Sequence, residues 1–488
     1  MKYIYTFILL FLLTSNGWSQ RLVSFEFLST TPRSDLNQQL PILRATNDVD
    51  LYRVIYMTPD ALGIDHEASG LVCVPVVDQA TTYPLACYQH GTVQGRNDVP
   101  SMEAGGHTLT IAFCARGYVV ATPDFVGLGI SPGVHPYVHA DTEASAAVDL
   151  LLATQEMMND PTFDNIVLND QLFISGYSQG GHAAMALHRA IELDNAGGFE
   201  VTASAPMSGP YSVSDAMVDF TLSGDPYETV SYIGWLTLGY QVAYPNLLAG
   251  FELEDVFLPQ FIPSVEAFRD ETILLNDLNS QMSQLLLDSV GSVTPVNTLR
   301  PEIADALIND PDHPLSQALA DNDVFDWAPQ APTNLYYCMG DEQVTFRNAT
   351  LAAGVMTANG SDQVTALQMD VGFPLTHGGC VLPASLATIN FFDGFRMTSS
   401  TIDQEDEDIS IFFADNLLHV DLTEASTTSA RLDIYNTTGI SAASISEVSG
   451  ESRHSLDGIE SGFYFVVLSN GNRILKSCLL YTSDAADE

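Results

Sequence analysis

Basic side chains are scarce in this sequence. Its 488 residues include 16 Lys and Arg but 61 Asp and Glu, which gives a formal net charge of −45 at pH 7. Such a charge repels phosphate backbones and anionic lipids, so nucleic acids and anionic membranes are poor candidates for partners. The same charge suits salty surroundings, where self-repulsion is screened, but an acidic secreted protein without that adaptation explains it equally well.

Long apolar runs are absent after the first residues. A single positive charge precedes a short apolar run at residues 4–13, and small residues follow at Gly17 and Ser19. This pattern is typical of a secretory signal peptide that occupies residues 1–19. No later stretch is long enough to cross a bilayer as a helix, so we expect a protein that is soluble or attached by other means.

Cysteine is also sparse, and no cysteines form a C-x-x-C pair or a Cys/His spacing typical of zinc. The six are Cys73, Cys87, Cys114, Cys338, Cys380 and Cys478. A disulfide between Cys338 and Cys380 and buried free thiols both fit the pattern, because cysteine also packs as a small apolar side chain. We therefore predict no metal site and leave the pairing open.

One motif stands out among what is present. An apolar run from Gln171 ends in Gly-Tyr-Ser-Gln-Gly at residues 176–180, and an alanine-rich helical pattern follows. This is G-x-S-x-G between a strand and a helix, the setting of a nucleophile elbow. Glycines on both sides of Ser178 remove Cβ atoms that would clash where strand and helix nearly touch. The bare pattern also arises by chance in a Ser/Gly turn, but its setting favours Ser178 as a nucleophile.

Strands and helices alternate on both sides of this motif. β-branched and aromatic runs predict strands, and apolar residues at a 3.6-residue period predict helices. The expected strands are 51–57, 70–76, 85–89, 118–124, 171–177, 199–206, 334–339 and 364–371, with helices at 106–116, from 141, from 182 and up to about 395. Such alternation indicates an α/β fold, a mainly parallel sheet flanked by helices. Residues 209–331 lose the alternation and predict a helical cap.

A serine nucleophile requires a base and an acid. In this fold the acid follows a strand end and the histidine comes last. Of eleven histidines, only His377 follows the acid's strand within the sheet-forming part of the chain, and two glycines come after it. Asp341 stands directly at the end of strand 334–339, with Glu342 and Asp370 as alternatives. We predict a triad of Ser178, His377 and Asp341.

Further site residues follow from the same architecture. The N–H of the residue after the nucleophile, Gln179, and an N–H in the loop after strand 85–89, assigned to Thr92, form the expected oxyanion hole. Tyr177 beside the nucleophile and Trp235 in the cap are candidates for contact with substrate, although cap aromatics also serve simply to pack the cap on the core. The chemistry requires no cofactor.

Residues 117–146 together with 176–183 resemble the secretory lipase family of α/β-hydrolases. The resemblance covers roughly residues 45–397 and is weak across the cap. It implies an α/β-hydrolase fold, ester hydrolysis by Ser178, Asp341 and His377, and a cap that shapes an acyl-binding site.

The composition changes after the closing helix. Residues 398–408 form a Ser/Thr-rich and then acidic linker, and residues 409–477 contain short strands typical of a small β-sandwich. Residues 432–439 and 462–467 resemble the C-terminal sorting domain of the type IX secretion system, which implies that secretion apparatus as a partner. A carbohydrate-binding or adhesive sandwich is the alternative. Residues 478–488 do not continue the pattern and are interpreted as a non-native tail.

The sequence thus predicts a secreted serine hydrolase of carboxylic esters, with a small-molecule or lipid ester as substrate. Residues 20–397 form the hydrolase domain. A serine peptidase of the prolyl oligopeptidase type uses the same triad, but usually carries a large N-terminal propeller for which there is no room here. A non-catalytic surface binding protein is the alternative from another class. The sequence does not settle the oligomeric state.

Overall fold

The structure is a computed structural model that describes residues 20–370, 372–397, 409–414, 417–422, 429–436, 441–456, 459, 462–470 and 473–482. The expected signal peptide and the acidic linker at 398–408 lie outside these residues, as do residues 483–488 of the expected tail.

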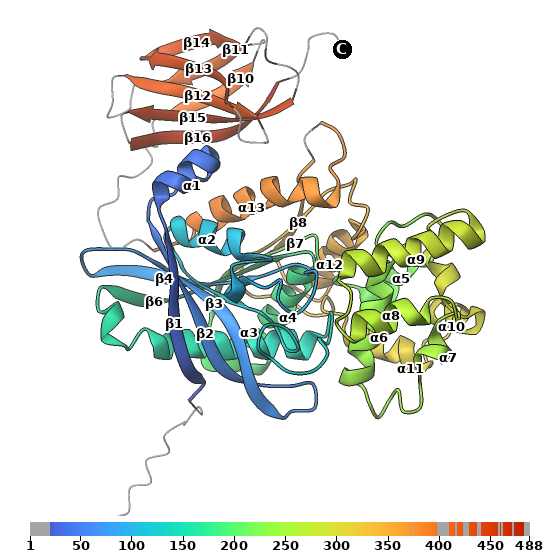
Figure 1. Ribbon diagram of the computed structural model, residues 1–488. Coiled ribbons are helices and arrows are strands. Elements are labelled where there is room, and N and C mark those ends of the chain that lie inside the picture. The colour runs from blue at the N-terminus through green and yellow to red at the C-terminus, as the bar shows by residue number, and fades with distance from the viewer. Residues whose placement is uncertain are drawn as a thin grey trace, which may run out of the picture.

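One large sheet organises the described residues before 398 (Figure 1). Its spatial order is β1-β2-β3-β5-β4-β6-β7-β8-β9. The strands are β1 Leu22–Thr31, β2 Val49–Pro59, β3 Asp65–Pro75, β4 Thr81–Gln89, β5 Val119–Pro123, β6 Ile166–Tyr177, β7 Val201–Met207, β8 Thr333–Tyr337 and β9 Val364–Gln368. β1, β2, β3 and β5 pair antiparallel, whereas β5, β4, β6, β7, β8 and β9 pair parallel. The carboxyl ends of these parallel strands therefore meet at one edge.

Helices cover both faces of the sheet, because parallel strands require crossover connections that return over a face. They are α2 His107–Ala115, α3 Ala140–Met157, α4 Gln179–Asp194, α12 Arg347–Ala358 and α13 His377–Asp393, whereas the short α1 Arg33–Gln39 connects the antiparallel β1 and β2 and has no buried residue. α2 and α13 pack on one face around Phe113, Phe173 and Phe392, and α3 and α4 pack on the other with Leu151 and Leu187. Apolar side chains on both faces explain the nearly continuous apolar runs of β4 and β6.

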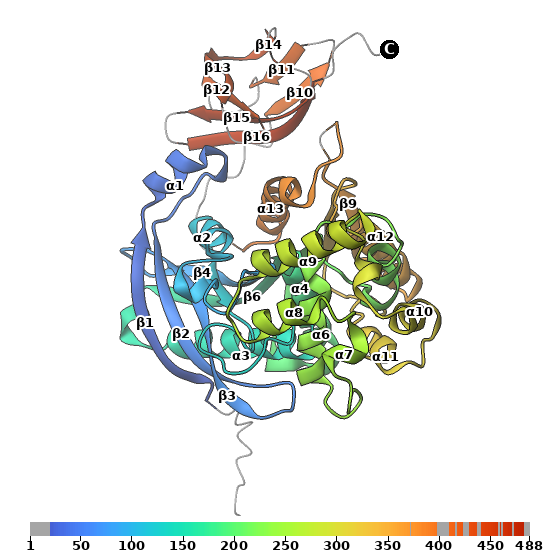
Figure 2. The ribbon, with the colours of Figure 1, turned by 45° about the vertical axis from the view of Figure 1, so that its right-hand side comes forward.

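The expected cap lies between β7 and β8 and is helical. It contains a π-helical turn Val213–Met217, α5 Val218–Thr221, α6 Ser231–Ala243, α7 Leu253–Val256, α8 Ile262–Arg269, α9 Leu275–Val290, α10 Pro301–Asn309 and α11 Pro314–Asp321. These helices gather beside the sheet rather than on either of its faces (Figure 1), and the view turned by 45° brings them forward (Figure 2). They have their own apolar core, in which Trp235, Phe257, Phe261 and Leu278 are buried.

The C-terminal residues form two small antiparallel sheets. One contains β10 Ser410–Ala414, β11 Leu417–Asp421 and β14 Glu451–Ser455; the other contains β13 Ser441–Val448, β12 Ala430–Asn436, β15 Gly462–Asn470 and β16 Arg473–Thr482. Leu418 of one sheet and Leu432 and Val466 of the other belong to one buried cluster, so the two sheets share a core.

Two features differ from the expectation. β1 was not predicted, although it pairs with β2 along its length. The C-terminal module was expected to end at Ser477, but β16 runs through Thr482, because Cys478 to Thr482 continue the antiparallel pairing with β15.

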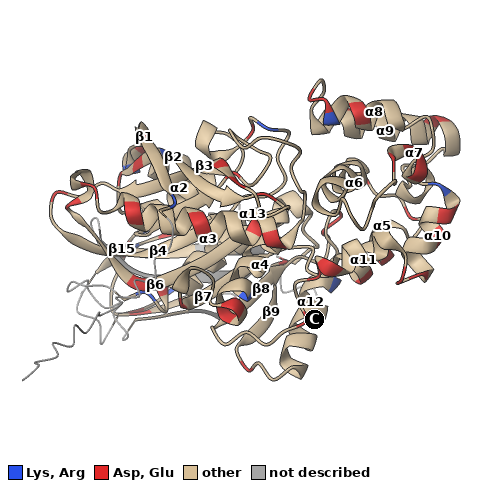
Figure 3. Cartoon of the chain, turned by 90° about the horizontal axis from the view of Figure 1, so that it is seen from below, with Lys and Arg blue, Asp and Glu red and all other residues tan. Residues whose placement is uncertain are grey.

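Acidic residues are spread over the helices and loops of the sheet part and the cap, while basic ones are few (Figure 3). Within the described part of the chain, no helix is long and apolar enough to cross a membrane.

Candidate active site

Ser178 lies at a sharp turn between β6 and α4. Its backbone has φ 61° and ψ −123°, a conformation that residues with a Cβ rarely adopt. The turn is fixed because the Ser178 N–H donates to the carbonyl of Met207 at 3.0 Å, and the Ser178 carbonyl accepts from the N–H of Gly181 at 2.8 Å. The side chain therefore stands at the N-terminus of α4, where the helix dipole and unpaired N–H groups favour a developing negative charge.

The glycines of the motif are required by close backbone contacts. A Cβ on Gly176 would lie 2.1 Å from the carbonyl oxygen of Gly180, and a Cβ on Gly180 would lie 1.9 Å from that of Gln89. A real Cβ does not approach backbone oxygens so closely. Strand β6, helix α4 and the end of β4 can thus converge at Ser178 only without these side chains.

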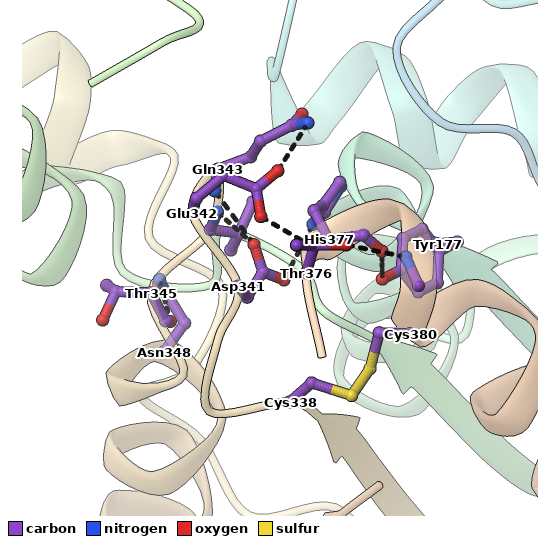
Figure 4. Close-up of polar contacts among 12 residues, drawn as sticks. Tyr177, Cys338, Asp341, Glu342, Gln343, Thr345, Asn348, Thr376, His377 and Cys380 are labelled. Atoms are coloured by element: carbon purple, nitrogen blue, oxygen red, sulfur yellow. Dashed lines mark hydrogen bonds and ion pairs between the residues drawn. A yellow bond between two sulfur atoms is a disulfide. The ribbon is translucent and has the colours of Figure 1, made fainter. Parts of the chain in front are cut away.

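His377 and Asp341 meet at the carboxyl edge of the sheet (Figure 4). His377 is the first residue of α13, and its Nδ1 lies 2.7 Å from Asp341 Oδ2, with both residues buried. The other carboxylate oxygen, Asp341 Oδ1, accepts from the N–H groups of Gln343 at 3.0 Å and Val344 at 2.8 Å. The acid is thus held on one side by its own loop and presents the other side to the imidazole.

Glu342 contacts the main chain of the same histidine. Its Oε2 accepts from the His377 N–H at 2.9 Å, a group that has no partner within its own helix. Burial disfavours the charged form of Glu342, but hydrogen bonds from the N–H of His377, from its own N–H and from the Gln343 side chain outweigh it and lower the pKa of Glu342. Asp341 and Glu342 therefore act together: one holds the ring of His377 and the other its backbone.

Asp370, the second alternative for the acid, has a different role. Its Oδ2 accepts from the N–H of Met339 at 2.7 Å and its Oδ1 from the N–H of Leu375 at 2.7 Å. Asp370 thereby ties the loop after β9 to the loop after β8. It supports the two segments that carry Asp341 and His377.

The disulfide that the sequence left open is formed. Cys338 bonds to Cys380, and the two are separated by 42 residues. Cys338 stands three residues before Asp341 and Cys380 three residues after His377, so the bond staples the acid-bearing loop to the first turn of α13. Cys73, Cys87 and Cys114 are free and buried.

Tyr177 does not lie where we predicted it. It is buried, and its hydroxyl donates to the carbonyl of His377 at 2.6 Å, with the two rings 5.0 Å apart. Burial raises the pKa of the Tyr177 phenol well above its ordinary value, so the hydroxyl stays a donor. Instead of lining a substrate cavity, the residue before Ser178 braces the histidine.

The loop after β4 reaches the nucleophile from the other side. A Cβ on Gly91 would lie 3.0 Å from the carbonyl oxygen of Tyr177 and 3.5 Å from Cβ of Ser178, so this backbone is in contact with the elbow. Thr92 follows directly, and its hydroxyl lies 2.7 Å from that of Tyr137. Gln179, the first residue of α4, has an N–H without an intrahelical acceptor. Both predicted oxyanion donors are therefore adjacent to Ser178 in space or in sequence.

A buried polar network beneath the elbow was not predicted. The Gln179 side-chain amide contacts His135 Nε2 at 2.8 Å and donates to Glu143 Oε1 at 3.0 Å, and Glu143 Oε2 lies 2.6 Å from His182 Nδ1. Burial lowers the pKa of His135 to about 3, so it is neutral and accepts from Gln179. Because Gln179 is fixed by its side chain as well as its backbone, the network restricts the position of its N–H. The only sequence signal is that Glu143 and His182 interrupt small and apolar residues.

An apolar cavity of about 140 Å³ opens at Ser178. Its wall combines Ser178 and Gln179 with Gln343 and Val344 of the acid loop and with residues of the cap. The cap residues are mostly apolar or aromatic, and include Val213, Met217, Leu222, Tyr232, Leu236, Tyr240, Leu299, Leu307, Leu315 and Leu319. Cap and catalytic loops thus enclose one space.

Trp235 does not contribute to this wall. Its ring stacks on Tyr137 at 4.9 Å, and Tyr137 faces the cavity in its place. Trp235 instead lines a second hollow with Arg96 and Phe268, behind the Tyr137 ring. Of the two residues predicted to contact substrate, neither lies in the wall of the cavity at Ser178. The described residues include no group of three or more His, Cys, Asp or Glu arranged to hold a metal ion.

Comparison with solved structures identifies similar proteins. The rice cell wall degrading esterase LipA from Xanthomonas oryzae matches with a TM-score of 0.67 and 27% identity, over 77% of this chain and 99% of that chain. The chain has the α/β-hydrolase fold. Candida antarctica lipase A shares that fold with a TM-score of 0.54 and 15% identity, over 78% of this chain and 84% of that chain. No protein-family model and no curated protein sequence matches.

These comparisons confirm the predicted fold class, and the similarity to LipA, an esterase, supports the broad expectation of an ester hydrolase.

Proposed function

We propose that this protein is a secreted serine hydrolase that cleaves carboxylic esters through Ser178, His377 and Asp341. The observation that carries the proposal is a combination. A serine at a strained elbow faces an apolar cavity, and a histidine that is hydrogen-bonded to the residue before this serine has its Nδ1 2.7 Å from a buried carboxylate. Esterases and lipases among the structural neighbours support the reaction class.

The proposed reaction proceeds in two halves. Ser178 Oγ attacks the ester carbonyl carbon while His377 takes its proton, and Asp341 stabilises the imidazolium that forms. The N–H groups of Gln179 and Thr92 bind the oxyanion. His377 then gives the proton to the departing alcohol, leaving an acyl group on Ser178. Water activated by His377 repeats these steps and releases the acid.

The lining of the cavity indicates whether the acyl part or the alcohol part of the ester binds there. Its wall is mostly apolar and begins at Ser178, so we expect it to hold an apolar acyl chain whose burial contributes about 0.8 kcal/mol per CH₂. A short, polar acid would leave most of this apolar wall without contact. The proposal therefore favours esters with medium or long acyl chains over acetyl esters.

Hydrolysis of p-nitrophenyl esters from acetate to palmitate by the full chain tests the proposal. Ser178→Ala should lower kcat by at least about 10⁴-fold on every ester. Ser175→Ala is the matched control, because its hydroxyl donates to the Ala205 carbonyl inside the sheet and should be dispensable for the chemistry. Wild-type protein that is inert on all esters but cleaves peptides would favour the peptidase alternative, and inactivity on both would favour a binding protein.

We further propose that the C-terminal module directs export by the type IX secretion system. Its support is the resemblance of residues 432–439 and 462–467 and the compact two-sheet arrangement with a shared core. In a bacterium with that system, removal of residues 409–482 should leave active enzyme inside the outer membrane. Export without the module, or binding of the module to polysaccharide, would contradict this assignment.

A further inference from the structure

The loop after β8 carries more than the catalytic acid. Four consecutive residues, Asp341 to Val344, form one structural unit, because Asp341 Oδ1 accepts the N–H groups of Gln343 and Val344. Through Asp341 and Glu342 this unit holds the ring and the backbone of His377. A displacement of the loop would therefore displace the histidine.

The cap holds the same loop from the opposite side. The hydroxyl of Tyr232, in the first turn of α6, donates to Gln343 Oε1 at 2.8 Å, and the hydroxyl of Tyr227 donates to the Gln343 carbonyl at 3.0 Å. Burial raises the pKa of the Tyr232 phenol to about 12. The phenol is thus a permanent donor over the range in which a serine hydrolase works.

The two sets of contacts join within one side chain. The Gln343 amide accepts from Tyr232 at Oε1 and donates through Nε2 to Glu342 Oε1 at 3.2 Å, while Glu342 Oε2 accepts from the His377 N–H. In Figure 4, dashed lines join Gln343 to Glu342 and Glu342 to His377. Hydrogen bonds therefore run without a break from cap helix α6 to the first residue of α13.

We propose that Tyr232, Gln343 and Glu342 are positioning residues through which the cap sets the geometry of His377. The inference rests on the proposed function and deepens it. Tyr232 and Gln343 both face the apolar cavity, so a chain bound there touches the link at its cap end. The position of the cap and the binding of an acyl chain are thereby coupled to His377. When the cap is displaced, Gln343 and Glu342 lose the support of Tyr232, and only the bonds from Asp341 and Tyr177 to His377 are unaffected.

The decisive experiment removes one hydroxyl from the cap. Tyr232→Phe keeps the ring and its packing but deletes the donor to Gln343. We expect kcat to fall about 5- to 20-fold, the effect of losing one well-placed hydrogen bond, with a smaller change in KM. The loss should also occur with p-nitrophenyl acetate, because it acts through His377 and not through contact with a long acyl chain. Ser264→Ala is the control, since it also deletes a hydroxyl from the cap. The Ser264 hydroxyl donates to Gln281 Oε1 at 2.8 Å, and neither residue lines the cavity.

A second variant tests whether the effect travels through the carboxylate. Glu342→Gln removes the charge that accepts from the His377 N–H, and we expect the acid limb of the kcat/KM profile to move to lower pH, because imidazolium loses a neighbouring negative charge. Asp341 and the phenols of Tyr177, Tyr227 and Tyr232 also face Glu342 and are unchanged in this variant. In the double variant with Tyr232→Phe the two losses should be less than additive, since both break one chain.

Amide hydrogen exchange gives a measurement that does not depend on activity. Tyr232→Phe and Glu342→Gln should each speed exchange in the peptide that begins at Thr376, while Ser264→Ala should not. Unchanged exchange there, or losses in kcat that add independently, would overturn the inference. If wild-type protein hydrolysed no ester but exchange responded as expected, the proposed function would be wrong. The hydrogen-bonded connection from Tyr232 to His377 would still be supported.

Discussion

The Tyr177 hydroxyl donates a 2.6 Å hydrogen bond to the main-chain carbonyl of His377. The residue directly before the proposed nucleophile thus holds the residue that would activate it. With Asp341 on the ring and Glu342 on the backbone N–H, His377 is held at three points, one at the end of β6 and two in the loop after β8.

Loss of this brace should reduce the rate of the chemical step. In Tyr177→Phe, the buried carbonyl of His377 loses its donor, and we expect kcat to fall about 10-fold while Tm falls by only a few degrees. Steady-state kinetics and thermal unfolding of the same preparation measure both. A normal kcat with a lowered Tm would show that Tyr177 stabilises the fold without positioning His377.

The nucleophile elbow should not tolerate a side chain at Gly180. A Cβ there meets the Gln89 carbonyl oxygen at 1.9 Å, so Gly180→Ala must move β4 or α4 and should reduce kcat/KM by at least about 100-fold. Gly378→Ala is the matched control beside His377, because its Cβ would meet nothing within 4 Å. Hydrolysis by the two variants under identical conditions makes the comparison. Equal activities would contradict the close packing of the elbow.

The disulfide should support both stability and catalysis. Closing a loop between Cys338 and Cys380 restricts the unfolded chain, and a stabilisation of about 3–4 kcal/mol is expected from a loop of this length. The double variant Cys338→Ala/Cys380→Ala should therefore unfold at lower denaturant concentration and also lose activity, because the two loops are no longer joined. Loss of stability with full activity at low temperature would show that Asp341 and Glu342 hold His377 without the staple.

Asp149 makes stability depend on pH. It is a buried residue of α3, its Oδ1 lies 2.9 Å from Arg21 Nε, and burial raises its pKa from 3.8 to about 6. A carboxyl with a raised pKa in the folded state favours folding at low pH, and this contribution disappears as pH rises through about 6. Asp149→Asn should therefore stabilise the folded state more at pH 8 than at pH 5, by about 1.4 kcal/mol in the free energy of unfolding, and thermal unfolding at the two pH values measures the difference.

Asp65 provides the control for that measurement. It lies 3.6 Å from the same arginine, but its side chain is 57% exposed. Asp65→Asn should shift Tm by similar small amounts at both pH values. If the Tm shift caused by Asp149→Asn is also the same at both pH values, burial of the charged Asp149 carboxylate does not destabilise the folded state, and the prediction is wrong.

Local patterns were enough to predict most of the fold. The alternation of strands and helices predicted the parallel sheet, and G-x-S-x-G predicted the close approach of strand and helix at Ser178. β1 was missed, although Val23, Phe25 and Phe27 alternate with Ser24 and Glu26, the pattern of a half-buried strand.

Contacts between distant segments could not be read from the sequence. The sequence around Trp235 does not indicate on which side of Tyr137 it packs. Similarly, no residue near Tyr177 indicates that the Tyr177 hydroxyl donates to the His377 carbonyl. Two glycines follow His377 in the sequence, but a Cβ on Gly378 would meet nothing within 4 Å, so no close contact requires a glycine at that position. The polar network of Gln179, Glu143 and His182 joins residues from α3 and α4, and only tertiary packing brings them together.

The identity of the nucleophile is tested most directly by covalent labelling. A p-nitrophenyl phosphonate transfers its phosphonyl group to an activated serine and releases p-nitrophenol, and peptide mass spectrometry locates the adduct. The account predicts one adduct, on the peptide that contains Ser178, none in Ser178→Ala, and labelling at least about 100-fold slower in His377→Ala. A label on another serine, or ester hydrolysis that persists in Ser178→Ala, would contradict it.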